Sequence, residues 1–147
     1  MSDDFLTLRD KRRIQSTIRR NSPVPQEELE SWFLPKREGV LRECREILRG
    51  NTGLTPKEIC GALQLIVLLT PLDQRHELVP LLQTFQSSET IVVRSFICRI
   101  AVVLWRFIDD AELRTSLKEI VTSFAKLGIN PAEEILVDEF IMQSSID

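Results

Sequence analysis

Residues 55–71 read TPKEICGALQLIVLLTP, and this stretch decides the fold. Thr55 can cap a helix, Pro56 suits its first position, and Glu58 can reach back to the cap. The residues from Ile59 to Leu69 are then apolar almost without interruption. A helix that is apolar on nearly every side belongs in the interior of a protein. The stretch therefore predicts a central, buried helix over 56–69.

Similar boundary signals occur along the rest of the chain. Thr70-Pro71, Asp109-Asp110 and Asn130-Pro131 resemble helix starts, and Gly128 resembles a C-terminal cap. Together they predict helices at about 4–20, 25–33, 37–49, 56–69, 71–86, 89–107, 110–127 and 131–142. The expected fold is all-α, with about eight helices in two closely packed small bundles around the central apolar helix.

Two segments leave alternatives open. Pro80 lies inside the segment 71–86 and is expected to kink or end that helix. Residues 91–104 are rich in β-branched side chains and could form a strand. Their length and their position between helices favour a buried helix.

Bulk composition indicates one compact domain over residues 1–147. The chain is 43% hydrophobic and 28% charged, which argues against disorder. The only plausible internal division lies near 86–88, and it is too short for a flexible linker, so two sub-bundles are expected to pack together. No apolar run approaches the length of a bilayer span, so any membrane contact is expected to be peripheral.

Charge is distributed unevenly along the sequence. The predicted first helix has Phe5, Leu8, Ile14 and Ile18 at its apolar positions. Its basic residues are Arg9, Lys11, Arg12, Arg13, Arg19 and Arg20. A basic amphipathic helix can bind anionic lipid or nucleic-acid phosphates, although a solvated face of an ordinary helix fits equally. No aromatic residue interleaves the arginines, so any nucleic-acid contact is expected to involve phosphate rather than bases.

Acidic residues gather at the opposite end. No basic residue follows Lys126, whereas Glu133, Glu134, Asp138 and Glu139 do. We expect these acids to pair head to tail with the basic residues of 9–20 in another copy, because opposite charges lie near the two ends of the chain. A heterologous contact of this kind builds an open layer. The alternative is that the two ends pair within one molecule. The single histidine, His76, lies beside charged residues and is most simply solvated, with a pH-sensing role as the alternative.

Motifs of enzyme chemistry are missing from the sequence. There is no P-loop, no dinucleotide-binding glycine motif, no nucleophile elbow and no zinc-protease motif. Cys44, Cys60 and Cys98 are widely spaced on apolar stripes, which is typical of reduced, buried thiols rather than metal ligands. We therefore expect a protein that is not an enzyme and that holds neither a metal nor a cofactor.

Two stretches resemble the N-terminal helical domain of orthomyxovirus matrix proteins. The first is Leu54-Thr55-Pro56…Ile59-Cys60-Gly61…Leu68-Leu69-Thr70-Pro71…Arg75…Leu78-Val79…Leu82-Gln83. It is similar to the family's short turn, the very apolar helix opened by Ser/Thr-Pro, and the Arg-containing helix that follows. The second is Ala125-Lys126-Leu127-Gly128-Ile129…Pro131…Glu133-Glu134, which resembles a late turn and helix of the same domain. The low identity fits a divergent, thogotovirus-like member better than influenza itself.

This resemblance implies a role as well as a fold. It implies two small helical bundles and a shell beneath the viral envelope that self-associates, contacts anionic membrane and binds the ribonucleoprotein or RNA. Such a protein would occur in the virion and in the host cytoplasm and nucleus. The sequence departs from the family on the sixth helix, where Arg94, Arg99 and Arg106 replace a compact basic run. The rival classes are a monomeric helical adaptor and a small nucleic-acid-binding regulator.

Overall fold

The computed structural model describes residues 6–50, 53–84 and 90–146, and within these ranges it contains helices and no strand. The expected all-α fold is confirmed. The chain divides into two compact units, residues 1–71 and 72–147. The division expected near 86–88 falls on residues outside the described ranges, and it is misplaced because the helix before it packs with the helices after it.

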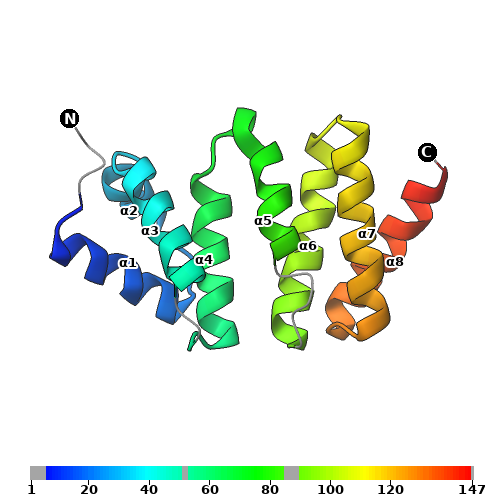
Figure 1. Cartoon of the computed structure of the whole chain (residues 1–147), viewed down its shortest axis with the longest axis horizontal. Helices are drawn as coiled ribbons and strands as arrows, with labels where there is room; N and C mark the ends of the chain where they lie inside the picture. The colour runs from blue at the N-terminus through cyan, green and yellow to red at the C-terminus, as the bar shows by residue number, and fades with distance from the viewer. Residues whose placement is uncertain (1–5, 51–52, 85–89, 147) are drawn as a thin grey trace. The chain divides into compact units, whose positions relative to one another are not determined.

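The first unit is built around one long apolar helix. Its elements are α1 (Leu8–Arg20), α2 (Gln26–Glu28), the π-helical turn η1 (Leu29–Phe33), α3 (Arg37–Gly50) and α4 (Pro56–Leu69). Helix α4 packs against both α1 and α3, which also contact each other (Figure 1). The segment predicted as one helix over 25–33 is therefore a short α-helical turn followed by a π-helical one.

Helix α4 begins as its sequence predicts. The Thr55 hydroxyl accepts a hydrogen bond from the Glu58 backbone N–H at 3.2 Å, and the Glu58 carboxylate accepts one from the Thr55 N–H at 3.1 Å. Leu63 and Ile66 are fully buried, as expected for the core. Burial does not extend all round, because Gln64 is exposed and Leu68 is 38% exposed. Val67 of the same helix, predicted to be buried over its whole length, is only partly buried.

Gly61 allows α1 and α4 to approach very closely. A Cβ atom at this position would collide with the carbonyl oxygen of Ile18 and would lie 3.0 Å from its carbonyl carbon. The backbone of α1 therefore occupies the space that any other residue at position 61 would need. Ile14 and Ile18 of α1, 0% and 2% exposed, are buried in the core of this unit.

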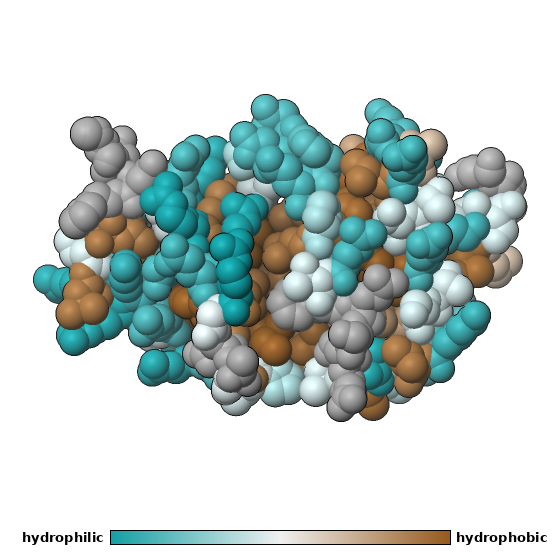
Figure 2. Space-filling model, viewed as in Figure 1, coloured by the Kyte–Doolittle hydropathy of each residue, from teal (hydrophilic) through white to brown (hydrophobic). Residues whose placement is uncertain are grey.

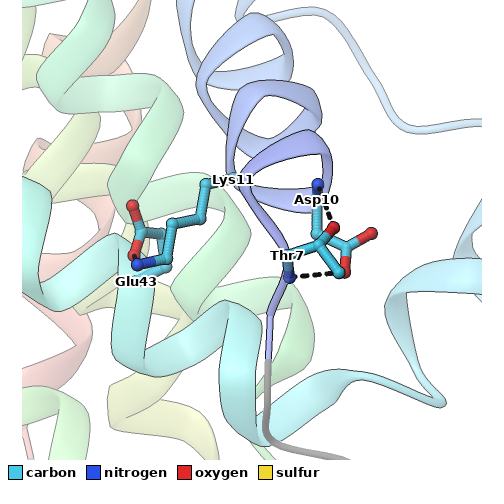
Figure 3. Close-up of polar contacts among 4 residues, drawn as sticks. All are labelled: Thr7, Asp10, Lys11 and Glu43. Carbon is cyan, nitrogen blue, oxygen red and sulfur yellow. Dashed lines mark hydrogen bonds and ion pairs between the residues drawn. The ribbon is translucent and has the colours of Figure 1, made fainter.

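Helix α1 begins later than the sequence indicated. Thr7 is the N-cap, with an extended backbone, and it forms a capping box with Asp10, so the helix starts at Leu8 rather than at residue 4 (Figure 3). Phe5, predicted on its apolar side, lies outside the described residues. Leu8, also predicted there, is 66% exposed, because it is turned away from the side that holds Ile14 and Ile18.

The second unit is a bundle of antiparallel helices. It contains the 3-10 helix η2 (Leu72–Glu77), α5 (Leu78–Thr84), α6 (Ile91–Phe107), α7 (Ala111–Leu127) and α8 (Pro131–Ile146). Helices α6 and α7 run side by side in opposite directions, α8 packs on both, and α5 also packs on both (Figure 1). The β-branched segment 91–104 is thus helical, and α8 continues past the predicted end at 142.

The segment predicted as one helix over 71–86 differs from the expectation. Thr70 caps the C-terminus of α4 and donates its hydroxyl to the Ile66 carbonyl at 2.6 Å, so it does not open the next helix. A 3-10 helix follows, and α5 begins only at Leu78. Pro80 neither ends nor interrupts α5, because it lies in the first turn, where a missing N–H costs no internal hydrogen bond.

Side chains of α6 hold the turn between α7 and α8. Gly128 ends α7 with a φ of 108°, a conformation that favours glycine. Arg94, only 6% exposed, donates from Nε to the Gly128 carbonyl at 2.9 Å and from Nη2 to the Leu127 carbonyl at 3.4 Å. Ser95 Oγ accepts the Asn130 N–H at 2.8 Å. Carbonyl groups left over at the end of α7 therefore find donors on α6.

Candidate functional site

Two of the six cations on α1 are committed to neighbours within the first unit. Lys11 Nζ lies 4.0 Å from Oε1 of Glu43, an α3 residue that is itself buried (Figure 3). Arg13 Nη2 contacts Glu28 Oε1 at 2.9 Å, and its guanidinium carbon lies 4.4 Å from the ring centroid of Trp32. Both side chains therefore join α1 to α2, η1 and α3, although each stays more than 40% exposed, and their role in membrane or RNA binding stays a prediction.

The other four cations form one exposed face. All four, Arg9, Arg12, Arg19 and Arg20, are exposed. Arg12 lies three residues after Arg9, seven before Arg19 and eight before Arg20, and these spacings place the four on one side of a helix. We call these four residues the α1 arginine face. It lies opposite the buried Ile14, and within the described part of the chain none of the four makes an ion pair or a hydrogen bond. The helix itself is held by its packing on α3 and α4, and these four arginines have their charge turned to solvent.

One end of this face meets the start of α4. The backbone hydrogen bond from Thr55 lowers the pKa of Glu58, the Thr55 hydroxyl adds to the effect, and nearby Arg19 contributes further. A cavity of about 180 Å³ opens beside Arg19 between α1, α3 and α4, and another of about 140 Å³ opens beside Arg20. Both are smaller than the usual cavity for an organic ligand. They offer room for an ion or water, not for a substrate of ordinary size.

Of the four acidic residues predicted for self-association, one is paired within its own unit and three are exposed. Glu133 Oε1 lies 3.5 Å from Arg99 Nη2 on α6, and the Glu133 side chain is only 12% exposed. It is therefore engaged within its own unit. Glu134, Asp138 and Glu139 remain exposed on α8. Head-to-tail pairing with residues 9–20 stays a prediction, now carried by these three acids and the α1 arginine face.

Exposed apolar side chains, which were not predicted from the sequence, accompany these acids on α8. Ile135 and Met142 are 67% and 70% exposed, and Figure 2 shows apolar surface over α8. Val137 and Phe140 occupy the buried side of the same helix. Ile135 and Met142 are seven residues apart, which places both on the side of the helix opposite Val137 and Phe140. This spacing could have been recognised in the sequence.

The three arginines of α6 have separate roles. Arg94 is the buried clamp of the α7–α8 turn, and Arg99 pairs with Glu133. Arg106 is exposed near the end of the helix. They do not form one basic surface.

The remaining candidate residues are the single histidine and the three cysteines. His76 is exposed in η2, as expected for a solvated histidine. Cys44, Cys60 and Cys98 are all buried as expected, and burial raises the pKa of Cys44 and of Cys98 to about 12. Over the described ranges, no group of three or more His, Cys, Asp or Glu side chains is placed to hold a metal ion.

A groove of about 550 Å³ is lined by one face of α7. The lining residues are Thr115, Lys118, Glu119, Thr122, Ser123 and Lys126. These side chains are polar and none is fully buried, so the groove is a solvated helix face.

In the part of the chain that is described, no helix is both long and apolar enough to cross a bilayer.

No family model, curated protein or solved structure matches this chain. The orthomyxovirus resemblance therefore stays a prediction that rests on the quoted motifs.

Proposed function

We propose that this chain is a structural matrix protein that binds peripherally to an anionic membrane surface through the α1 arginine face and self-associates into a layer. The observation that carries the proposal is the division of the α1 cations into two that are paired and four that are exposed. Two of its cations and its apolar side chains anchor the helix, while Arg9, Arg12, Arg19 and Arg20 are left together in solvent. A helix held in this way presents its charge to a flat surface without having to refold.

Membrane is favoured over RNA as the principal partner by the composition of this helix. Exposed Leu8 lies beside Arg12 on the helix surface and can enter the boundary between headgroups and acyl chains. The guanidinium groups then meet the headgroup phosphates, which are good bidentate acceptors. The resemblance to matrix proteins supports the same role, with a location beneath a viral envelope. Ribonucleoprotein phosphates are a second ligand of the same chemistry.

Vesicle binding with a matched control tests the proposal. Arg9→Ser/Arg12→Ser/Arg20→Ser removes three charges from the face, and Arg19 is retained because it lies near Glu58. Each nearby cation contributes about 1 kcal/mol, so binding to phosphatidylserine vesicles is expected to fall roughly a hundredfold. The control Arg45→Ser/Arg49→Ser/Lys57→Ser removes the same charge from α3 and α4 and is expected to bind much more like the wild type.

Three results would overturn the membrane-binding part of the proposal, and a fourth would overturn self-association. The first is wild-type binding to phosphatidylserine no stronger than to phosphatidylcholine. The second is an equal loss in both triple variants, which would indicate net charge rather than a site. The third is tight binding of a homopolymeric RNA through the same three arginines, with no binding to vesicles, which would indicate a nucleic-acid-binding regulator. A steady monomer on vesicles and at low salt would favour the adaptor class.

A further inference from the structure

Helix α8 carries an exposed surface on which apolar and acidic side chains alternate. We call Ile135, Asp138, Glu139 and Met142 the α8 patch. Ile135 and Met142 are about two turns apart, and the two acids lie between them. The helix contains no lysine or arginine. The buried side of α8 is formed by other residues, Val137 and Phe140, so the patch is not an unpacked part of the core.

A second surface of the same unit carries two arginines beside exposed apolar side chains. We call Arg75, Val103, Arg106 and Phe107 the α6 patch. Val103 is 42% exposed and Phe107 63% exposed, about one turn apart on α6. The Arg75 guanidinium carbon lies 5.0 Å from the Phe107 ring centroid, which places its charge over the aromatic face. Helix α6 contains no acidic residue.

We propose that the α6 patch of one copy docks on the α8 patch of a second copy. Each patch has two exposed apolar side chains and two charges, and the charges are opposite in sign. Docking removes four apolar side chains from water and places two arginines against two carboxylates. Within one copy, α6 and α8 already meet through Arg99 and Glu133 and through the edge-to-face rings of Trp105 and Phe140. The intermolecular contact repeats that complementarity on the outer sides of the two helices.

The geometry of this contact suits a layer. Two different surfaces meet, so each copy keeps one free α6 patch and one free α8 patch, and the assembly does not close unless the rotation makes a ring. The α1 arginine face fits the α8 patch less well, because it adds only one exposed apolar side chain, Leu8. It also stays available for the membrane. The inference rests on the self-association proposed above and specifies the surfaces that carry it.

Charge exchange between two variants tests the contact. Asp138→Lys/Glu139→Lys makes the α8 patch basic, and Arg75→Glu/Arg106→Glu makes the α6 patch acidic. Each variant alone is expected to self-associate about tenfold more weakly than the wild type on vesicles and at low salt. An equimolar mixture is expected to recover assembly, because every contact between unlike copies again joins opposite charges. Glu112→Lys/Glu119→Lys on α7 has the same change in charge as the α8 variant and is expected to assemble normally.

Cross-linking provides a measurement that does not depend on charge. Copies with Val103→Cys are mixed with copies carrying Met142→Cys, and oxidation is expected to join one of each kind. The native thiols do not interfere, because Cys44, Cys60 and Cys98 are buried. Circular dichroism and thermal unfolding establish that each variant is folded before its assembly is measured.

The outcomes separate this inference from the proposed function. A wild type that never self-associates overturns both. Normal assembly of the two patch variants overturns the contact and leaves self-association standing. Rescue of the α8 variant by Arg9→Glu/Arg12→Glu, but not by Arg75→Glu/Arg106→Glu, also overturns it and assigns the α8 patch to α1 of the next copy. Recovery in the specified mixture together with the mixed cross-link supports the contact.

Discussion

Gly61 has the most restricted environment among the glycines whose surroundings the structure describes. The carbonyl group of Ile18 lies where its side chain would be, and that group belongs to the backbone of α1. A backbone cannot turn aside as a long side chain does, so a larger residue must push the two helices apart. Since α1 carries the arginine face on its other side, the packing at Gly61 also sets how firmly that face is held.

Gly61→Ala is expected to destabilise the first unit by about 1–3 kcal/mol, the usual cost of overpacking a well-filled interior. Urea unfolding followed by circular dichroism measures the change. Gly50→Ala is the matched control, because nothing lies within 4 Å of the added Cβ there. It is expected to change stability little or to increase it slightly, since alanine favours a helix more than glycine does. Equal effects at the two positions would contradict a close approach at Gly61.

Residue by residue, the sequence indicated the charges but not their partners. All six cations of α1 looked equivalent, yet Arg13 is engaged by Glu28 and Trp32, which lie 15 and 19 positions away. Glu133 is similarly paired with Arg99, 34 positions away. Contacts of this kind depend on tertiary packing, and a single sequence contains no local signal for them. The spacing of Arg9, Arg12, Arg19 and Arg20 on one face was, in contrast, a local property and could have been read directly.

At the scale of elements, capping residues determined where helices begin. Thr55, Asp110 and Gly128 act as the sequence predicted. The start of α1 was misplaced because Thr7 and Asp10 form a capping box that was not recognised, although the signal is present in the sequence. The segment 71–84 was less predictable. A 3-10 helix gives no strong periodic pattern in six residues, so η2 could not be distinguished from the beginning of a longer α-helix.

The two capping boxes of the first unit make its stability depend on pH. Hydrogen bonds from the Thr7 and Thr55 backbones lower the pKa values of Asp10 and Glu58, whose ordinary values are 3.8 and 4.5. A lowered pKa in the folded state means that the contribution is fully present above the unfolded value and is lost as pH falls through the folded value. Stability is therefore expected to decrease between about pH 5 and pH 3.

Asp10→Asn/Glu58→Gln is expected to reduce this part of the pH dependence while costing little near pH 3. Both residues are only partly buried, so the loss at pH 7 is modest. Urea unfolding of wild type and variant at pH 7 and pH 3 gives the comparison. A difference between the two proteins that is the same at both pH values would show that ionisation of these caps contributes nothing.

The whole molecule consists of two units, each with its own buried core. Ile14, Val40 and Leu63 belong to the first, and Ile97, Leu117 and Phe124 to the second. Each unit has just over seventy residues, close to the lower limit at which a single core is sufficient. Two small cores in one chain raise the question of whether they open together or separately.

The buried cysteines allow this question to be answered. Burial raises the pKa values of Cys44 in the first unit and Cys98 in the second from 9.0 to about 12. The folded chain at pH 8 therefore has far less thiolate at each site than an opened one, and only the thiolate reacts with iodoacetamide. The rate at which each cysteine is alkylated reports the opening of its own unit.

We expect the two units to open separately. Gly61→Ala is then expected to accelerate alkylation of Cys44 and leave Cys98 at the wild-type rate. Leu117→Ala, which removes a fully buried side chain at a cost of about 2–5 kcal/mol, is expected to do the reverse. Peptide mass spectrometry after timed labelling resolves the two sites. Parallel acceleration of both cysteines by either substitution would mean that the chain opens as one cooperative block. Separate opening would let the first unit adjust on a membrane through α1 without disturbing the α6 and α8 patches of the second.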